Sequence, residues 1–98
     1  RATMGWIRGQ DLWVRDGREP SGAVFVIRKA LGNAVVRNRL KRRLRHILRD
    51  LDVPISGSVV LLARPSAARQ SFEVLSQEVG QLLQRLQDSA SAHQIAHD

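Results

Sequence analysis

The sequence contains no cysteine, so it can form neither a disulfide framework nor a metal site built on thiolates. It also lacks an apolar run of the ~18 residues that a membrane-spanning helix needs. We see no signal peptide at its start. Aromatic residues make up only 4% of the 98 residues, so the core must consist mainly of Val, Leu, Ile and Ala. We expect one small cytoplasmic domain that does not enter a membrane.

Acidic residues are also scarce, because nine Asp and Glu stand against sixteen Lys and Arg and leave a formal net charge of +7. Such a balance points to nucleic acid or an anionic membrane surface as the partner. A protein nuclease would need paired carboxylates as general acid and base, or carboxylates that hold metal ions. The acids are scattered along the chain instead, and there is no Gly-rich phosphate loop and no nucleophile motif. We therefore expect neither a catalytic residue nor a protein-bound metal.

Two pairs of residues resemble parts of metal sites. His93 and His97 have the i, i+4 spacing of a metal-binding pair, but no third ligand accompanies them. Asp50 and Asp52 end the basic part of the chain, where the dipole of a helix would disfavour them. A tail and a solvated turn explain the two pairs better than cation sites do.

The densest feature is a basic stretch from Arg37 to Arg49, which holds seven of the sixteen Lys and Arg and no acidic residue. Apolar residues recur along it at the spacings of an amphipathic helix. They are Val36, Leu40, Leu44, Ile47, Leu48 and Leu51. Asn33 is a favourable N-cap, and Gly32 before it permits a tight turn. One face of this helix should pack on a core, while its cations repel one another unless a polyanion neutralises them.

Three strands are predicted around this helix. Residues 11–15 alternate as a half-buried strand does, and residues 23–29 form a β-branched run that ends in two cations. A turn-rich loop separates these two segments, so we expect them to pair as an antiparallel hairpin. Residues 58–64 form a short apolar run, which indicates a buried central strand.

A second amphipathic helix is predicted from Ser66 or Ser71 to about Gln87. Its apolar residues are Phe72, Leu75, Val79, Leu82, Leu83 and Leu86. Residues 1–87 should form a single domain, followed by a flexible tail at 88–98. The order of elements predicts an α+β fold, in which a small sheet carries a basic helix in a βαβ crossover and a C-terminal helix.

The segment from Lys29 to Arg45 resembles the signature of the protein subunit of bacterial ribonuclease P. A Lys-containing strand end, a Gly-Asn-Ala-Val run and an Arg-Asn-Arg helix rich in cations follow one another in that order. Residues 61–64, followed by Pro65 and a helix, are similar to the last strand of that family and its Ala-Arg turn. The resemblance covers about residues 8–87.

The resemblance implies a protein component of an endoribonuclease that matures the 5′ end of tRNA, in which a catalytic RNA cleaves with Mg²⁺ and the protein binds. It implies contact with the ribonuclease P RNA through Arg37, Asn38, Arg39, Lys41, Arg42, Arg43 and Arg45. The 5′ leader of precursor tRNA would meet Trp13, Arg28, Lys29 and Arg64. Guanidinium forks suit phosphate, and a flat ring can stack on an unpaired base. The resemblance also implies a left-handed crossover, against the usual right-handed one.

Some of these residues also fit structural roles. Arg37 and Arg43 lie close to the apolar stripe of the basic helix, and Trp13 can equally be a core residue. Phe25 fits a core position better than a binding one. Arg42 and Arg45 point most clearly away from the stripe, so they are the cleanest candidates for phosphate contact.

The chain departs from the family at its front. Nothing before Trp6 resembles the N-terminal helix that helps to wall the leader cleft in family members. This departure leaves three explanations open: leader binding is weakened, the helix has been lost from this chain, or a second copy replaces it in an oligomer. A small basic ribosomal-type RNA-binding protein is the alternative function. A DNA-binding protein that recognises bases with a helix is a third hypothesis. Such a protein usually has a pair of helices, whereas the basic helix of this chain lies between strands.

Overall fold

The computed structural model describes residues 5–51 and 57–97 of the chain. Its elements follow in the order β1 (Ile7–Arg8), β2 (Leu12–Asp16), β3 (Gly22–Val26), the 3-10 helix η2 (Lys29–Leu31), α1 (Ala34–Asp50), β4 (Ser58–Ala63), the 3-10 helix η3 (Pro65–Arg69) and α2 (Phe72–His97). This order confirms the predicted α+β class. Asp52 lies outside the described residues, as do the side chains of His93 and His97.

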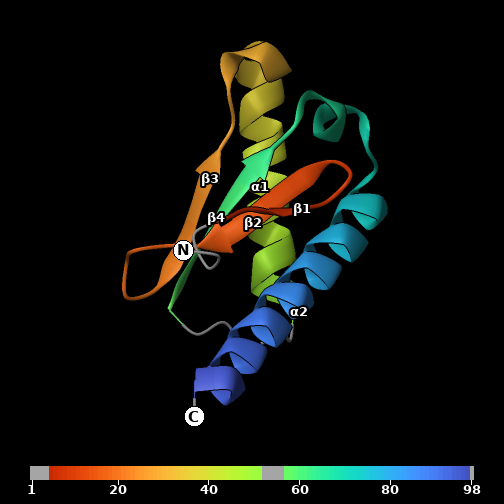
Figure 1. Cartoon of the computed structure of the whole chain (residues 1–98). Helices are drawn as coiled ribbons and strands as arrows, with labels where there is room; N and C mark the ends of the chain where they lie inside the picture. Colours follow the sequence, from red (N-terminus) through yellow and green to blue (C-terminus); the bar gives the residue numbers. More distant parts are fainter. Residues whose placement is uncertain (1–4, 52–56, 98) are drawn as a thin grey trace.

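The four strands form one mixed sheet in the order β1-β2-β4-β3 (Figure 1). β4 pairs antiparallel with β2 on one side and parallel with β3 on the other. The predicted central position of residues 58–63 is therefore confirmed. The predicted hairpin of β2 with β3 is wrong, because the apolar β4 takes the place between them and satisfies the backbone hydrogen bonds of both. The loop between β2 and β3 passes the start of β4, where the Gly17 N–H donates to the Ser58 carbonyl at 2.9 Å.

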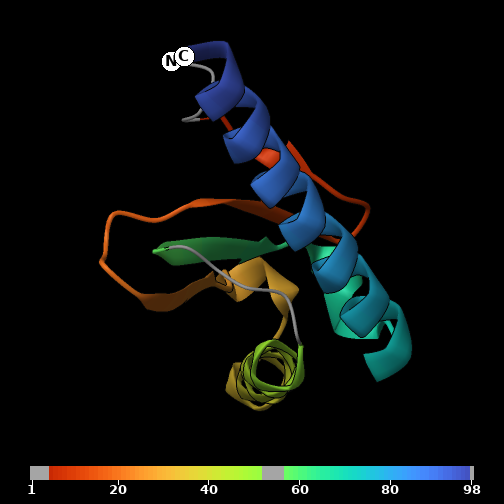
Figure 2. The ribbon, with the colours of Figure 1, turned by 90° about the horizontal axis from the view of Figure 1, so that it is seen from below.

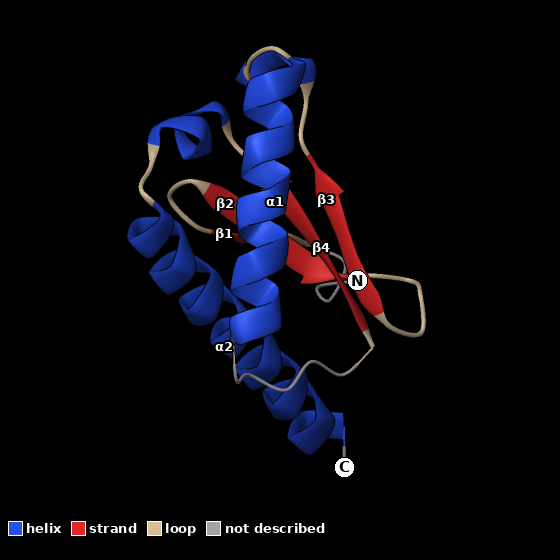
Figure 3. Ribbon diagram, turned by 180° about the vertical axis from the view of Figure 1, so that it is seen from behind, coloured by secondary structure: helices blue, strands red, loops and turns tan. Residues whose placement is uncertain are grey.

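The core lies between the sheet and the two helices. α1 covers one face of the sheet, and α2 crosses it and packs along the β1–β2 side, so that α1 is seen end-on in Figure 2 while α2 lies across the view (Figures 2 and 3). All buried hydrophobic residues in the described ranges are Leu, Val, Ile or Ala, which confirms the expected composition of the core. Phe25 is half-buried and packs against this core, as predicted.

α1 begins where the sequence predicted. The Asn33 side chain accepts a hydrogen bond from the Val36 N–H at 3.0 Å and so caps the helix. Gly32 before it has a φ of 143°, and a Cβ there would lie 3.1 Å from the Val36 Cβ. Glycine suits this position because it carries no side chain into that contact. The three buried residues of α1, Leu40, Leu44 and Ile47, belong to the predicted stripe.

At the C-terminal end of α1, the side chains of His46 and Asp50 contact each other within the helix. The His46 Nε2 and an Asp50 carboxylate oxygen lie 3.0 Å apart. Asp50 therefore pairs with a side chain one turn away. In the described parts of the chain, no group of three or more His, Cys, Asp or Glu is placed to hold a metal ion.

α2 is longer than the sequence predicted. It starts after Ser71, whose hydroxyl accepts from the Val74 N–H at 3.2 Å, and it continues to His97 instead of ending near Gln87. Residues 88–97 are thus helical, so a tail without secondary structure is the wrong description of them. The mobility of this segment stays a prediction, as does the hand of the β3-α1-β4 crossover. Among the described residues no helix is long and apolar enough to cross a membrane.

Candidate nucleic-acid interface

The outer side of α1 presents a continuous polar surface. Asn38, Lys41, Arg42 and Arg45 recur at spacings of three and four, so they share one side of the helix, and with Val35 they line a shallow groove of about 470 Å³. We call these four polar residues the α1 ridge. The structure describes no acidic side chain in an ion pair with the ridge, so its positive charge is not neutralised within residues 5–51 and 57–97.

The other predicted cations of α1 lie beside the ridge. Arg39 is exposed, whereas Arg37 and Arg43 are half-buried. The Arg37 Nε donates to the Gly32 carbonyl at 3.1 Å, which ties the side chain to the turn before the helix. Arg37 therefore has the structural contact that its place next to the apolar stripe suggested. Its remaining guanidinium N–H groups can still bind phosphate.

Trp13 lies on the face of the sheet that α1 does not cover. Its neighbours in β2, Leu12 and Val14, are fully buried on the helix side, so Trp13 points the opposite way. Arg8 is the partner of Trp13 in the β1–β2 ladder, and its guanidinium carbon lies 4.8 Å from the centre of the Trp13 ring. The guanidinium carbon of Arg64, which follows β4, lies 5.5 Å from the same centre.

A second aromatic residue extends this arrangement. The centre of the Trp6 ring lies 6.3 Å from that of Trp13 with an angle of 52° between the rings, and the Arg15 guanidinium carbon lies 4.8 Å from the centre of Trp6. We call Trp6, Arg8, Trp13, Arg15 and Arg64 the Trp13 cluster. Each guanidinium over a ring contributes on the order of 0.5–1 kcal/mol at a partly exposed site. The rings therefore restrict where these cations can lie.

A pocket of about 250 Å³ opens beside the Trp13 ring. Trp13, Arg28 and Arg64 line it together with residues of η2 and the end of β4. The expected convergence of cations at one end of the sheet is confirmed for Arg28 and Arg64, because β3 and β4 are parallel neighbours. Lys29 is not part of the lining. The chain turns into η2 at this residue, and its side chain is exposed.

Sequence reasoning missed Trp6, Arg8 and Arg15. β1 contains only two residues, which are too few to show the alternation that marks a strand. Arg8 reaches Trp13 only through the β1–β2 ladder, and no spacing along the chain announces that pairing. The one available signal was the charge and aromatic content of residues 6–15.

Glu78 on α2 holds the turn from which Trp13 emerges. One of its carboxylate oxygens accepts the backbone N–H groups of Asp11 and Leu12 at 2.7 Å each. The Asp11 carbonyl in turn accepts from the Arg64 N–H at 2.9 Å. A Cβ on Gly9 would lie 2.5 Å from the same Glu78 oxygen, so only glycine leaves room for this contact. Helix α2 thus positions both Trp13 and Arg64 through their neighbours.

The environment of Glu78 changes its acidity. Burial disfavours the carboxylate and raises the pKa of Glu78 above the ordinary value of 4.5, while the two backbone N–H groups oppose this change. The carboxyl group of the buried Asp11 next to it acts in the same direction as burial. The surroundings of Glu78 therefore disfavour its ionised form, although the two N–H contacts themselves stabilise that form.

The α1 ridge and the Trp13 cluster lie on opposite sides of the sheet, because α1 covers one face and Trp13 projects from the other. Their chemistry also differs, since the ridge offers separate charges and the cluster offers guanidinium groups stacked on rings. The molecule is a small basic α+β protein with two surfaces suited to a polyanion.

Comparison with known proteins agrees with this description. The family model described as Ribonuclease P matches residues 11–87, so the chain belongs to the ribonuclease P protein family. The ribonuclease P protein component of Streptomyces avermitilis is 46% identical over 69 residues, which are 68% of this chain and 56% of that protein. The component from Thermus aquaticus is 45% identical over 61 residues, or 62% of this chain and 37% of that protein. The chain thus spans about half the length, or less, of these curated relatives.

Solved structures share the fold. The ribonuclease P protein from Thermotoga maritima superposes with a TM-score of 0.70 at 24% identity, over 83% of this chain and 82% of that one. A Staphylococcus aureus ribonuclease P protein gives 0.70 at 20% identity, over 82% and 78%. At these identities the likeness concerns the arrangement of helices and strands alone.

Proposed function

We propose that this chain is the RNA-binding subunit of ribonuclease P, which binds the catalytic RNA through α1 and the 5′ leader of precursor tRNA through the pocket beside Trp13. One observation carries the proposal: Trp13, Arg28 and Arg64, which lie far apart in the sequence, line a single pocket on the side of the sheet opposite the α1 ridge. A protein that only neutralised RNA would have no need of such an aromatic pocket. Two opposed surfaces suit a protein that joins an enzyme RNA to its substrate.

At the α1 ridge the work is electrostatic. Lys41, Arg42 and Arg45 face solvent, and each phosphate that they neutralise releases condensed counterions from the RNA. The amide of Asn38 between them can bond a base edge or a 2′-hydroxyl, which adds a geometric requirement to the charge. Arg37, Arg39 and Arg43 flank this contact and extend it.

At the Trp13 cluster the work is positional. The guanidinium groups of Arg8 and Arg64 lie against the ring, so their N–H edges can meet phosphates without first losing side-chain freedom. The adjacent pocket admits an unpaired base whatever its identity, as single-stranded RNA of variable sequence requires. Lys29 lies beside this pocket and would add charge along the leader.

The cleavage chemistry in this proposal belongs to the RNA subunit and its Mg²⁺. The residues of the chain bind, orient and screen two polyanions from each other. The same role places the protein in the cytoplasm, where precursor tRNA is processed, without a membrane partner. An oligomer of the free protein is a further proposal, which sedimentation of the free protein tests.

Reconstitution tests the proposal. The protein is added to a bacterial ribonuclease P RNA at low Mg²⁺, and cleavage of precursor tRNAs with leaders of graded length is followed. We expect stimulated cleavage at the mature 5′ end, with an affinity that rises with leader length. A basic ribosomal-type protein would bind the RNA without any dependence on the leader, and that result would overturn the proposal.

A further inference from the structure

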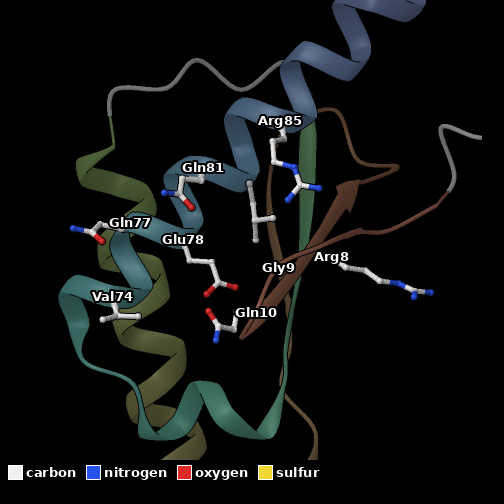
Figure 4. Close-up of a pocket in the computed structure, with 9 residues that line it drawn as sticks. Arg8, Gly9, Gln10, Val74, Gln77, Glu78, Gln81 and Arg85 are labelled. Carbon is white, nitrogen blue, oxygen red and sulfur yellow. The ribbon is translucent and has the colours of Figure 1, made fainter.

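A second pocket lies between α2 and the turn that joins β1 to β2 (Figure 4). Its volume is about 410 Å³, within the range of roughly 300–1,000 Å³ that is usual for ligand sites. Neither the α1 ridge nor the pocket beside Trp13 includes it. We call it the α2 groove, and its polar lining consists of Arg8, Gln10, Gln77, Glu78, Gln81 and Arg85.

The lining suits a nucleotide better than a simple ion. Gln77, Gln81 and Arg85 recur every four residues, so they form one stripe along α2. Each amide offers both donors and an acceptor, which is what the edge of a base requires, and Arg85 offers a fork for a phosphate. Gln10, from the turn between β1 and β2, lies beside the Glu78 carboxylate on the other wall (Figure 4).

Glu78 is the acidic side chain in the lining of the groove. One of its oxygens accepts the N–H groups of Asp11 and Leu12, which partly offset its charge. The remaining oxygen can accept from the amino group of a base. Within the groove Arg85 offsets the charge of Glu78, and Arg8 adds a positive charge at the edge, where its side chain points away from the other lining residues (Figure 4).

Arg8 connects the α2 groove to the Trp13 cluster. It lines the groove, and its guanidinium carbon lies 4.8 Å from the centre of the Trp13 ring. A single strand that passes Trp13 can therefore continue past Arg8 into the groove. We propose that the α2 groove binds one unpaired nucleotide of the RNA leader, next to those that meet Trp13. This inference rests on the proposed function and adds a subsite to it.

Substitution of Arg85 tests the subsite. In binding assays with precursor tRNAs of graded leader length, Arg85→Ala should lower the affinity about tenfold for leaders that reach the groove and leave shorter leaders unaffected. Arg18→Ala removes the same charge from the exposed β2–β3 loop and should act weakly and equally at all lengths. Equal profiles for the two variants would overturn the subsite.

Cross-linking supplies a second, independent readout. Because the chain has no cysteine, a photoreactive group can be attached at position 81 alone in the Gln81→Cys variant. We expect this variant to cross-link a single leader nucleotide, and the matched Ser21→Cys variant to cross-link none. Cross-links that miss the leader would overturn the subsite even if the protein stimulates cleavage. If cleavage is not stimulated, the proposed function fails, and cross-linking to a single-stranded RNA alone then decides whether the groove binds a nucleotide.

Discussion

The α1 ridge and the Trp13 cluster are both cationic, but they hold their charges in different ways. The cations of the ridge stand on the exposed side of a helix and are held only by their backbone positions. Those of the cluster lie against Trp6 and Trp13 at 4.8–5.5 Å. The affinity of the ridge for RNA should therefore depend on salt concentration and on the number of charges. That of the cluster should depend on the arrangement of individual side chains.

The largest expected effect is the loss of charge from the ridge. Replacing both Arg42 and Arg45 by Ala should weaken binding to the catalytic RNA between about 10- and 100-fold and lower the slope of log K against log salt by roughly 2. Filter binding over a salt series measures both quantities. The double variant Arg18→Ala with Arg69→Ala removes the same charge outside the two surfaces. If it weakened binding equally, the ridge would have no special role.

The second-largest effect is expected for Glu78→Ala, which disturbs the Trp13 cluster through the turn that Glu78 holds. Two N–H groups lose their acceptor, so the free energy of unfolding should fall by about 2–3 kcal/mol. Urea unfolding measures this change. Leader affinity should fall as well, since Asp11 and Leu12 no longer hold the turn, while binding to the catalytic RNA persists below the unfolding transition. Equal loss at both surfaces would contradict the separation of the two sites.

Trp13→Ala should affect the substrate alone. Loss of one stacking ring costs about 1–3 kcal/mol in affinity for leader-bearing RNA. Binding to the catalytic RNA should be unchanged, and precursor tRNA without a leader should bind as it does to the wild type. Trp13→Phe keeps a ring and should recover most of the affinity. If Phe and Ala behaved alike, the ring would serve only as packing.

The smallest expected effect concerns pH. Because the pKa of Glu78 is raised in the folded chain, the folded state holds its proton more tightly than the unfolded state does. The resulting stability is fully present below the ordinary value of 4.5 and is lost as the pH rises through the raised value. Glu78→Gln cannot titrate at this position. The unfolding free energy of the wild type minus that of the variant should therefore decrease as the pH rises through this window. A constant difference from acid to neutral pH would show that Glu78 titrates normally.

Local features of the fold were predictable because their causes are local. Asn33 caps α1 whatever surrounds it, since the Val36 N–H that it satisfies lies three residues away. The stripe of Leu40, Leu44 and Ile47 follows from the helical period. The end of α2 was predicted too early because the apolar pattern stops near Leu86, whereas the backbone hydrogen bonds of a helix continue without it.

Strand pairing was not predictable in the same way. Nearness in sequence favoured a hairpin of β2 with β3, but pairing with the more apolar β4 buries more surface on both sides of that strand. Such a choice depends on the competition among all strands for one central position. The interpretation of Arg28 and Arg64 as neighbours was correct, since it required only that their strands be adjacent and parallel.

The sequence by itself determined the basic helix and its cap, because both depend on residues within a few positions of one another. It also determined the composition of the core, through the scarcity of aromatic residues, and the family, through the signature from Lys29 to Arg45. Only the tertiary structure decided that Arg8, Arg64 and Trp6 gather around Trp13, and that Glu78 holds the turn before it. Those contacts join β1, β2, β4 and α2, and ladder register and helix packing set their distances. The spacing of residues along the chain predicts neither the ladder register nor the helix packing.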